Sequence, residues 1–284
     1  VVLMANMLKS ELSSGAIGLS TGLEYDPGIY SDRSEVMTLA QVAADAGGRY
    51  ISHIRSEDRW FEDAIDEIIE IGRSTKMPVQ ISHFKLAQKS LWNQAARILK
   101  KLDQAVKEGV NITADLYPYE YWQSNMMVLL PERDPTDRNA VALALDQIAP
   151  PEGIWLTRFD PEPNYVGKTI VEIAEERQMD PITTYMQLAQ ESQLMKKGSD
   201  MIIGTSMIED DIRTLLLWER TNVCSDGGLV DLHPRGMGSF TKILGKYVRE
   251  EGIMSLEIAI RKMTGLAADH MGFNDRGYIR IGQM

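Results

Sequence analysis

One short pattern occurs twice in the sequence, and it limits the folds that the chain can adopt. His53 closes the run Tyr50-Ile-Ser-His53, and His83 closes Gln80-Ile-Ser-His83, with a basic residue two positions after each histidine. Both runs read as strands. In a β/α barrel the carboxyl ends of parallel strands converge on one mouth, where two imidazoles can share a metal ion. The repeat therefore predicts an α/β barrel with His53 and His83 as metal ligands.

Composition permits a globular enzyme and argues against several other classes. The chain has 284 residues, 44% hydrophobic and 25% charged, which suffices for a large core. Its net charge of −11 would repel a polyanion, so we expect a small-molecule substrate and no nucleic-acid partner. No apolar stretch approaches the roughly 20 residues of a membrane span, so no membrane partner is expected. The single Cys224 suits a reducing cytoplasm.

Strand and helix signals alternate as they do in βα units. We expect strands near 16–20, 50–54, 79–84, 110–116 and 221–225, and helices near 3–12, 34–46, 60–75, 91–108, 240–250 and 255–268. Between about 120 and 220 this rhythm breaks, because prolines cluster there. Two strand signals in that region, at 154–158 and 201–204, flank helices near 167–177 and 181–192.

These boundaries predict three parts. Residues 1–119 form βα units of the barrel, residues 120–220 form an insertion over the barrel mouth, and residues 221–284 supply the last barrel strand and the closing helices. Pro-rich loops with small elements of their own often form lids of this kind.

Asp226 ends the last expected strand and is the candidate catalytic residue. A carboxylate beside a metal can take a proton from water and return it to a leaving amine. Asp226-Gly-Gly is also an ordinary turn signal, and a lone histidine is more often packed or exposed than a ligand. Two matched strand-end histidines together with a third strand-end acid favour the metal site over these alternatives.

Six segments carry a resemblance to a known family. They are Gly15-Ala-Ile-Gly-Leu-Ser-Thr-Gly-Leu-Glu-Tyr25, Tyr50-Ile-Ser-His-Ile-Arg-Ser-Glu57, Gln80-Ile-Ser-His-Phe-Lys85, Asp115-Leu-Tyr-Pro-Tyr119, Ser225-Asp-Gly227 and His233-Pro-Arg-Gly-Met-Gly-Ser-Phe240. In this order and spacing they resemble the N-acyl-D-amino-acid deacylases, or D-aminoacylases, of the amidohydrolase superfamily. The resemblance implies a metal-dependent hydrolase TIM barrel that is incomplete here, with roughly the last five of its eight strands, so we expect the chain to be a fragment of a longer protein. It also implies zinc-dependent hydrolysis of N-acyl-D-amino acids to a carboxylate and a free D-amino acid.

The resemblance also implies roles for single residues. His53 and His83 would be histidine ligands of one or two zinc ions whose other ligands lie outside this chain. Asp226 would act as general base and then acid. The family's His-x-His pair occurs nowhere in this sequence. Two alternatives therefore stay open: a cyclic-amide hydrolase of the hydantoinase or dihydroorotase kind, and a metal-free homologue that acts only as a binding module.

Three further residues are expected to bind substrate. By the resemblance, Lys85 and Tyr117 hold the substrate carboxylate and amide, which suits an ammonium charge and a hydroxyl donor. Lys85 as a solvated side chain and Tyr117 as a packed one remain open. Arg235 is a candidate for carboxylate binding or for support of the metal ligands. Arg55 and Glu57 are expected to pair with each other or to brace the metal ligands.

Overall fold

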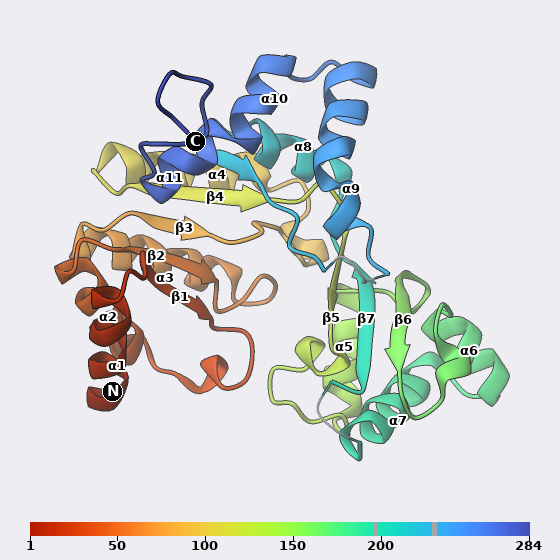
Figure 1. Cartoon of the computed structure of the whole chain (residues 1–284). Coiled ribbons are helices and arrows are strands. Elements are labelled where there is room, and N and C mark those ends of the chain that lie inside the picture. The colour runs from red at the N-terminus through yellow and green to blue at the C-terminus, as the bar shows by residue number, and fades with distance from the viewer. Residues whose placement is uncertain (196–197, 229–231) are drawn as a thin grey trace.

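A parallel sheet carries the candidate residues at one edge. The computed structural model describes residues 1–195, 198–228 and 232–284. Its five parallel strands lie in the order β1-β2-β3-β4-β8 (Figure 1). They are β1 (Gly18–Gly22), β2 (Arg49–His53), β3 (Val79–Ile81), β4 (Ile112–Leu116) and β8 (Thr221–Val223). This sheet confirms the α/β class and the five expected strands. The third strand is shorter than expected, because His83 adopts a left-handed backbone conformation with φ of 38°.

Helices cover the outer face of this sheet. They are α1 (Val2–Ser13), α2 (Arg33–Asp45), α3 (Phe61–Thr75), α4 (Ala95–Lys107) and α8 (Glu209–Leu217). α1 packs on α2, and the other four each contact a strand of the sheet. α3 buries the apolar face that its periodicity predicts, which includes Phe61, Ile65 and Ile68. Gly72 on that face approaches the sheet so closely that a Cβ there would lie 2.7 Å from Val110 Cγ1.

The strand register brings the functional ends of the strands together. Gly22 of β1 lies beside His53 of β2, and Ser52 lies beside Ile81 of β3. Farther along the sheet, Leu116 of β4 lies beside Val223 of β8. The residues that follow these strands therefore emerge at the same edge of the sheet, as expected for a β/α barrel.

A second, antiparallel sheet lies beyond that edge (Figure 1). Its strands, in the order β5-β7-β6, are β5 (Tyr121–Ser124), β7 (Asp200–Thr205) and β6 (Ile154–Phe159). The accompanying helices are α5 (Arg138–Gln147), α6 (Ile170–Arg177) and α7 (Pro181–Gln193). Sequence patterns located β6, β7, α6 and α7 but missed β5, α5 and α8. Although α8 falls inside the expected insertion 120–220, it packs against α4 and β8 of the parallel sheet.

The closing helices differ from their expected spans. α9 (Arg235–Lys242) begins before residue 240 and continues as a π-helical segment, η6 (Ile243–Glu250). The single helix expected over 255–268 is two helices, α10 (Leu256–Met263) and α11 (Gly265–Met271), because the backbone of Thr264 leaves the helical region at φ −135° and ψ −85°. Among the described residues, no helix has the length and apolar character needed to cross a membrane.

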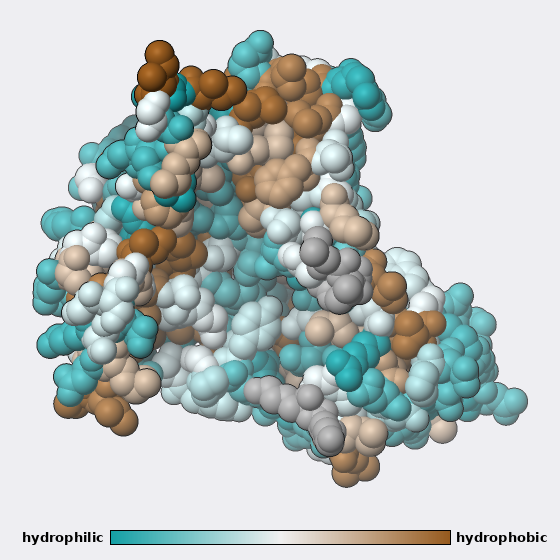
Figure 2. Space-filling view, viewed as in Figure 1, coloured by the Kyte–Doolittle hydropathy of each residue, from teal (hydrophilic) through white to brown (hydrophobic). Residues whose placement is uncertain are grey.

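The two sheets face each other across a hollow. The space-filling view shows the molecule hollowed between the parallel-sheet part and the antiparallel-sheet part, with mostly hydrophilic residues inside the hollow (Figure 2). Ile65 of α3, Ile81 of β3 and Ile98 of α4 are among the largest fully buried side chains and belong to the parallel sheet and its helices, whereas Phe159 and Tyr185 belong to the antiparallel-sheet part. The core therefore supports the sheet from outside and leaves the strand ends free to build a site.

Candidate metal centre and active site

The two predicted histidines lie against each other at the strand ends. His53 is the last residue of β2, and His83 follows β3 after one intervening residue, Ser82. His53 Nδ1 is 2.9 Å from His83 Nε2. Both side chains are largely shielded from solvent, with 8% and 12% of their surfaces exposed. The structure therefore brings together the histidines that the repeated Ile-Ser-His pattern singled out.

Two carboxylates that sequence reasoning did not assign to the metal site complete this cluster. Glu24 Oε2 lies 2.8 Å from His53 Nε2, and Glu57 Oε1 lies 3.0 Å from His83 Nδ1. His53, Glu57 and His83 each offer a ligand atom, and these atoms lie within 4.8 Å of one another. Glu57 stands four residues after His53, and Glu24 is the last residue but one of the motif at 15–25, so both had a signal in the quoted motifs.

Electrostatics favour the metal-binding forms of His83 and Glu57. Burial, together with the positive charge of Lys85, lowers the pKa of His83 and favours its neutral imidazole. Burial alone would raise the pKa of Glu57, but the charges of His53 and Lys85 outweigh it and lower that pKa, so Glu57 is ionised. Burial raises the pKa of Glu24. Two imidazoles and one carboxylate are a ligand set found in catalytic zinc sites, so these residues fit that ion.

Lys85 is engaged inside the site. Its Nζ lies 2.5 Å from Glu57 Oε1 and 2.7 Å from His83 Nδ1, and only 6% of the side chain is exposed. The alternative of a solvated Lys85 is therefore wrong. The expected pairing of Arg55 with Glu57 is also wrong, because Arg55 donates two hydrogen bonds of 2.8 Å to Glu67 on α3.

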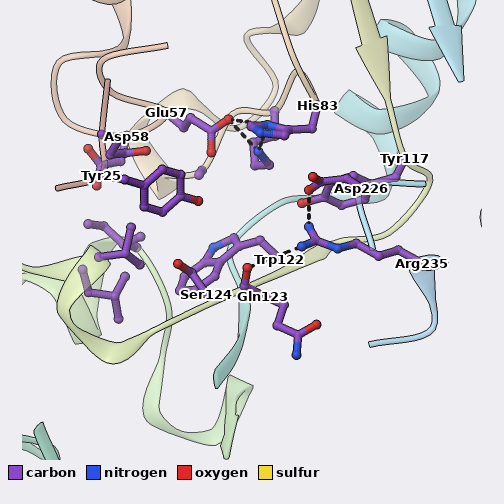
Figure 3. Close-up of a pocket in the computed structure, with 16 residues that line it drawn as sticks. Tyr25, Glu57, Asp58, His83, Tyr117, Trp122, Gln123, Ser124, Asp226 and Arg235 are labelled. Carbon is purple, nitrogen blue, oxygen red and sulfur yellow. Dashed lines mark hydrogen bonds and ion pairs between the residues drawn. The ribbon is translucent and has the colours of Figure 1, made fainter. Parts of the chain in front are cut away.

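Asp226 and Arg235 form an ion pair on the other side of the cavity. Arg235 Nη1 lies 2.5 Å from Asp226 Oδ2 (Figure 3). Asp226 follows β8 and has a left-handed backbone with φ of 49°, whereas Arg235 is the first residue of α9. His233 accepts the Arg235 backbone N–H at Nδ1 and contacts the Tyr121 carbonyl at 2.8 Å through Nε2, so it ties the start of α9 to β5.

Tyr117 lies between the two charged pairs with an unused hydroxyl. Lys85 Nζ is 5.6 Å and Arg235 Cζ is 4.8 Å from the centre of its ring. The hydroxyl is buried and has no hydrogen-bond partner among the described residues. Burial raises the pKa of Tyr117 well above 10, so the hydroxyl keeps its proton and can donate. A buried donor without a partner is unusual in proteins and is available to a ligand.

One pocket connects these groups. Figure 3 shows Glu57 and His83 on one side, Asp226 and Arg235 on another, and Tyr25 and Trp122 around the open centre. The antiparallel-sheet part closes the cavity with residues that the sequence did not identify as lining: Trp122, Gln123, Ser124, Val128, Leu129 and Ile148. Five of the six predicted site residues line this pocket, and His53 lies directly beside it, in contact with His83.

Comparisons with known proteins agree with this arrangement. No protein-family model matches the chain. Over 281 residues it is 36% identical to N-acyl-D-glutamate deacylase of Alcaligenes xylosoxydans xylosoxydans, covering 98% of this chain and 52% of that protein. It is 28% identical to D-aminoacylase of the same organism over 284 residues, covering 99% of this chain and 53% of the relative. The chain spans about half the length of the curated relatives it matches.

Solved structures give the same result. The crystal structure of N-acyl-D-glutamate deacylase from Bordetella bronchiseptica, complexed with zinc and a phosphonate inhibitor that mimics the tetrahedral intermediate, matches with a TM-score of 0.83 and 34% identity. The match covers 98% of this chain and 54% of that one. A D-aminoacylase structure described as a novel subset of amidohydrolases matches with a TM-score of 0.82 and 28% identity, covering 99% and 55%. Over nearly its whole length the chain is therefore similar to N-acyl-D-amino-acid deacylases, and it matches about half of each of them.

Proposed function

We propose that this protein hydrolyses the amide bond of N-acyl-D-amino acids with the help of zinc. The observation that carries the proposal is the His53, Glu57 and His83 group facing Asp226 and the unpartnered Tyr117 hydroxyl across one cavity. The similarity adds support, because similar proteins are named for deacylation of N-acyl-D-glutamate and N-acyl-D-aspartate. We also retain the cytoplasm as the proposed location, since Cys224 is a free thiol.

His53, His83 and Glu57 would hold the zinc ion. Zinc bound in this way supplies Lewis-acid polarisation of the acyl carbonyl and makes water a stronger acid. His83 suits this task because burial favours its neutral imidazole. The contact between Lys85 and Glu57 then balances part of the negative charge of the carboxylate. Two imidazoles, one carboxylate and one ammonium group thus form a connected cluster at the cavity wall.

The chain's own side chains would move the proton and bind the developing charge. Asp226 would accept a proton from the attacking water and return it to the leaving amine nitrogen, which becomes the free amino group of the product. Arg235 orients the Asp226 carboxylate by contacting Oδ2. The Tyr117 hydroxyl would donate a hydrogen bond to the carbonyl oxygen as negative charge develops there. Lys85 and Arg235 are the cations that the α-carboxylate of the substrate can meet in the cavity.

Substrate class is tested with a matched set of compounds on the zinc-loaded protein. We expect release of the free amino acid from N-acetyl-D-amino acids, and a strong preference for D over L, because carboxylate, acyl group and side chain are fixed at three points. The α-carboxamide analogue, which lacks the carboxylate, should be a poor substrate. Faster hydrolysis of a hydantoin or dihydropyrimidine ring would favour the cyclic-amide alternative, and no hydrolysis of any amide would favour the binding module.

Asp226→Asn tests the proton transfer within the same assay. The variant should keep its zinc and lose about two orders of magnitude in kcat, as expected when a general base and acid is removed. Asp160→Asn is the matched control, because Asp160 pairs with Arg158 on the surface of the antiparallel part, away from the cavity. A kcat for Asp226→Asn close to that of the control would mean that Asp226 only forms a turn and takes no part in proton transfer.

A further inference from the structure

Asp115 receives no role in the proposed reaction, yet it lies directly beneath the metal-binding group. It belongs to β4 and begins the motif Asp115-Leu-Tyr-Pro-Tyr119. Its Oδ1 accepts the backbone N–H of His83 at 2.6 Å, and its main-chain carbonyl accepts the N–H of Phe84 at 2.7 Å. One residue of β4 thus binds two successive peptide groups of the segment that follows β3.

The segment that Asp115 binds is in a conformation that would not form readily by itself. His83 has a φ of 38°, in the left-handed region that residues with a Cβ rarely adopt. Such conformations persist only where the surrounding structure over-determines them, and they are common at functional sites. The turn has a direct effect on the site, because it ends β3 at Ile81 and lets the imidazole of His83 reach Nδ1 of His53.

Asp115 is itself fixed by a neighbour on β3. Gln80 of that strand donates from Nε2 to Asp115 Oδ2 at 2.5 Å. Thr113, on the same strand as Asp115, donates to Gln80 Oε1 at 3.2 Å and so fixes the orientation of the amide. Together with the His83 N–H on Oδ1, the carboxylate therefore has one donor on each oxygen, and its position relative to the turn is determined by the sheet.

We propose that Asp115 is a positioning residue that fixes His83 as a metal ligand and, through the same turn, places Lys85 against Glu57. The inference rests on the proposed function, since it takes His83 to be a zinc ligand. Asp115 acts through the backbone of His83 and does not touch the ion or the substrate. In metal sites, partners of the ligands set the orientation of those ligands, and their loss typically weakens metal affinity by about 10–100-fold.

The test measures metal binding directly. Zinc affinity is determined by competition with a chromogenic chelator, and the absorption of the cobalt(II)-loaded protein reports the geometry at the ligands. We expect Asp115→Ala to weaken zinc binding by about 10–100-fold and to change the cobalt absorption bands. Asp115→Asn, which keeps an oxygen acceptor for the His83 N–H, should retain more of the affinity than Asp115→Ala.

Asp211→Ala is the matched control. Asp211 is also buried and its carboxylate also accepts two backbone N–H groups, from Asn93 and Ala95, but these residues lie near the start of α4 and not in the site. This variant loses comparable hydrogen bonds and should keep the affinity and the cobalt spectrum of the wild type. Equal losses in Asp211→Ala and Asp115→Ala would show a general effect of destabilisation and would overturn the proposal.

The remaining outcomes separate the inference from the proposed function. Wild-type protein that binds no zinc would contradict the proposed metal site itself. Tight zinc binding by the wild type, with unchanged affinity and spectrum in Asp115→Ala, would overturn only the role of Asp115. If Asp115→Ala does not fold, Asp115→Asn decides: weaker zinc binding with altered cobalt bands supports positioning, and wild-type values for both contradict it.

Discussion

Lys85 and Glu57 form a buried ion pair at the centre of the candidate site. Their contact of 2.5 Å is shielded from solvent, and Glu57 also contacts His83 at 3.0 Å. A buried pair of this kind stabilises little by itself, but removing one partner leaves an uncompensated charge in a poorly solvated place. Lys85 therefore has a structural task in addition to its proposed contact with the substrate carboxylate.

The buried pair predicts that the effects of Lys85 and Glu57 substitutions on the free energy of unfolding are coupled. Lys85→Met should lower the free energy of unfolding by about 3 kcal/mol, because Glu57 loses its counter-charge. Adding Glu57→Gln should recover most of that loss, since the charge itself is then absent. Chemical denaturation of the two single variants and the double variant measures the coupling. Additive losses across the three variants would mean that the pair is not coupled in the folded protein.

Tyr117 has a buried hydroxyl with no hydrogen-bond partner among the described residues, and this predicts opposite effects of its removal on activity and on stability. Tyr117→Phe should lower kcat by roughly 10²–10³-fold, the usual cost of one oxyanion donor, with little change in KM. The same change should leave the free energy of unfolding unchanged or raise it by about 1 kcal/mol, because it removes a buried and unpaired hydroxyl. Steady-state kinetics and thermal unfolding of one variant check both effects. A destabilised and fully active Tyr117→Phe would contradict the assignment.

At the scale of elements, α11 is tied to the parallel sheet by a histidine that is not part of the site. His270 lies in the last turn of α11, and Gly272 caps the helix with a φ of 72°. The Nδ1 atom of His270 lies 2.7 Å from Oδ1 of Asn222 on β8. Burial lowers the pKa of His270 from 6.5 to about 4. The imidazole is therefore neutral near pH 7 and adds no positive charge to the end of the helix.

The lowered pKa predicts a pH dependence of stability. Between pH 6.5 and about 4 the unfolded chain binds more protons at His270 than the folded protein does. The contribution of this residue to stability is therefore present above pH 6.5 and is lost as the pH falls towards 4. His270→Gln, which can still donate to Asn222, should flatten this part of the stability curve. Thermal unfolding in buffers across this range measures the slope, and identical slopes in both proteins would exclude His270 as its source.

At the scale of the whole molecule, the metal group joins elements that are far apart in sequence. His53 ends β2, Glu57 follows that strand and His83 follows β3, so an ion bound there connects two βα units. A ligand that binds only the folded state stabilises it by mass action, by about 2.7 kcal/mol when its free concentration is 100 times its Kd. Zinc should therefore stabilise the molecule against unfolding.

This connection predicts the effect of metal removal. Stripping zinc with a chelator should lower Tm, and adding zinc back should restore it. His53→Ala and His83→Ala should each lose about one equivalent of zinc and most of this response, because a site with so few ligands rarely tolerates the loss of an imidazole. His270→Gln is the control and should keep its zinc. Elemental analysis and thermal unfolding read out both effects, and full zinc content in both alanine variants would contradict the ligand assignment.

The sequence by itself determined the βα rhythm, the five parallel strands and the two histidines at strand ends. These features are local, because strand periodicity and the position of a residue at the end of a strand can be read from a few neighbouring residues. The apolar face of α3 follows from the same kind of local pattern. The repeated Ile-Ser-His runs also sufficed to place two imidazoles at one edge of a parallel sheet, because the fold aligns all carboxyl ends there.

Only the tertiary structure decided which charged groups meet. Arg55 pairs with Glu67 on α3, so Glu57 is left to contact His83 and Lys85, and no periodicity in the sequence distinguishes these pairings. The strands and helices that sequence patterns missed, β5, α5 and α8, are short or lie in the Pro-rich region, where local signals are weakest. The left-handed backbone of His83, and the hydrogen bond from its N–H to Asp115, arise because β3 and β4 are neighbours in the sheet. Contacts between residues distant in the chain are set by packing, and packing exists only in the folded molecule.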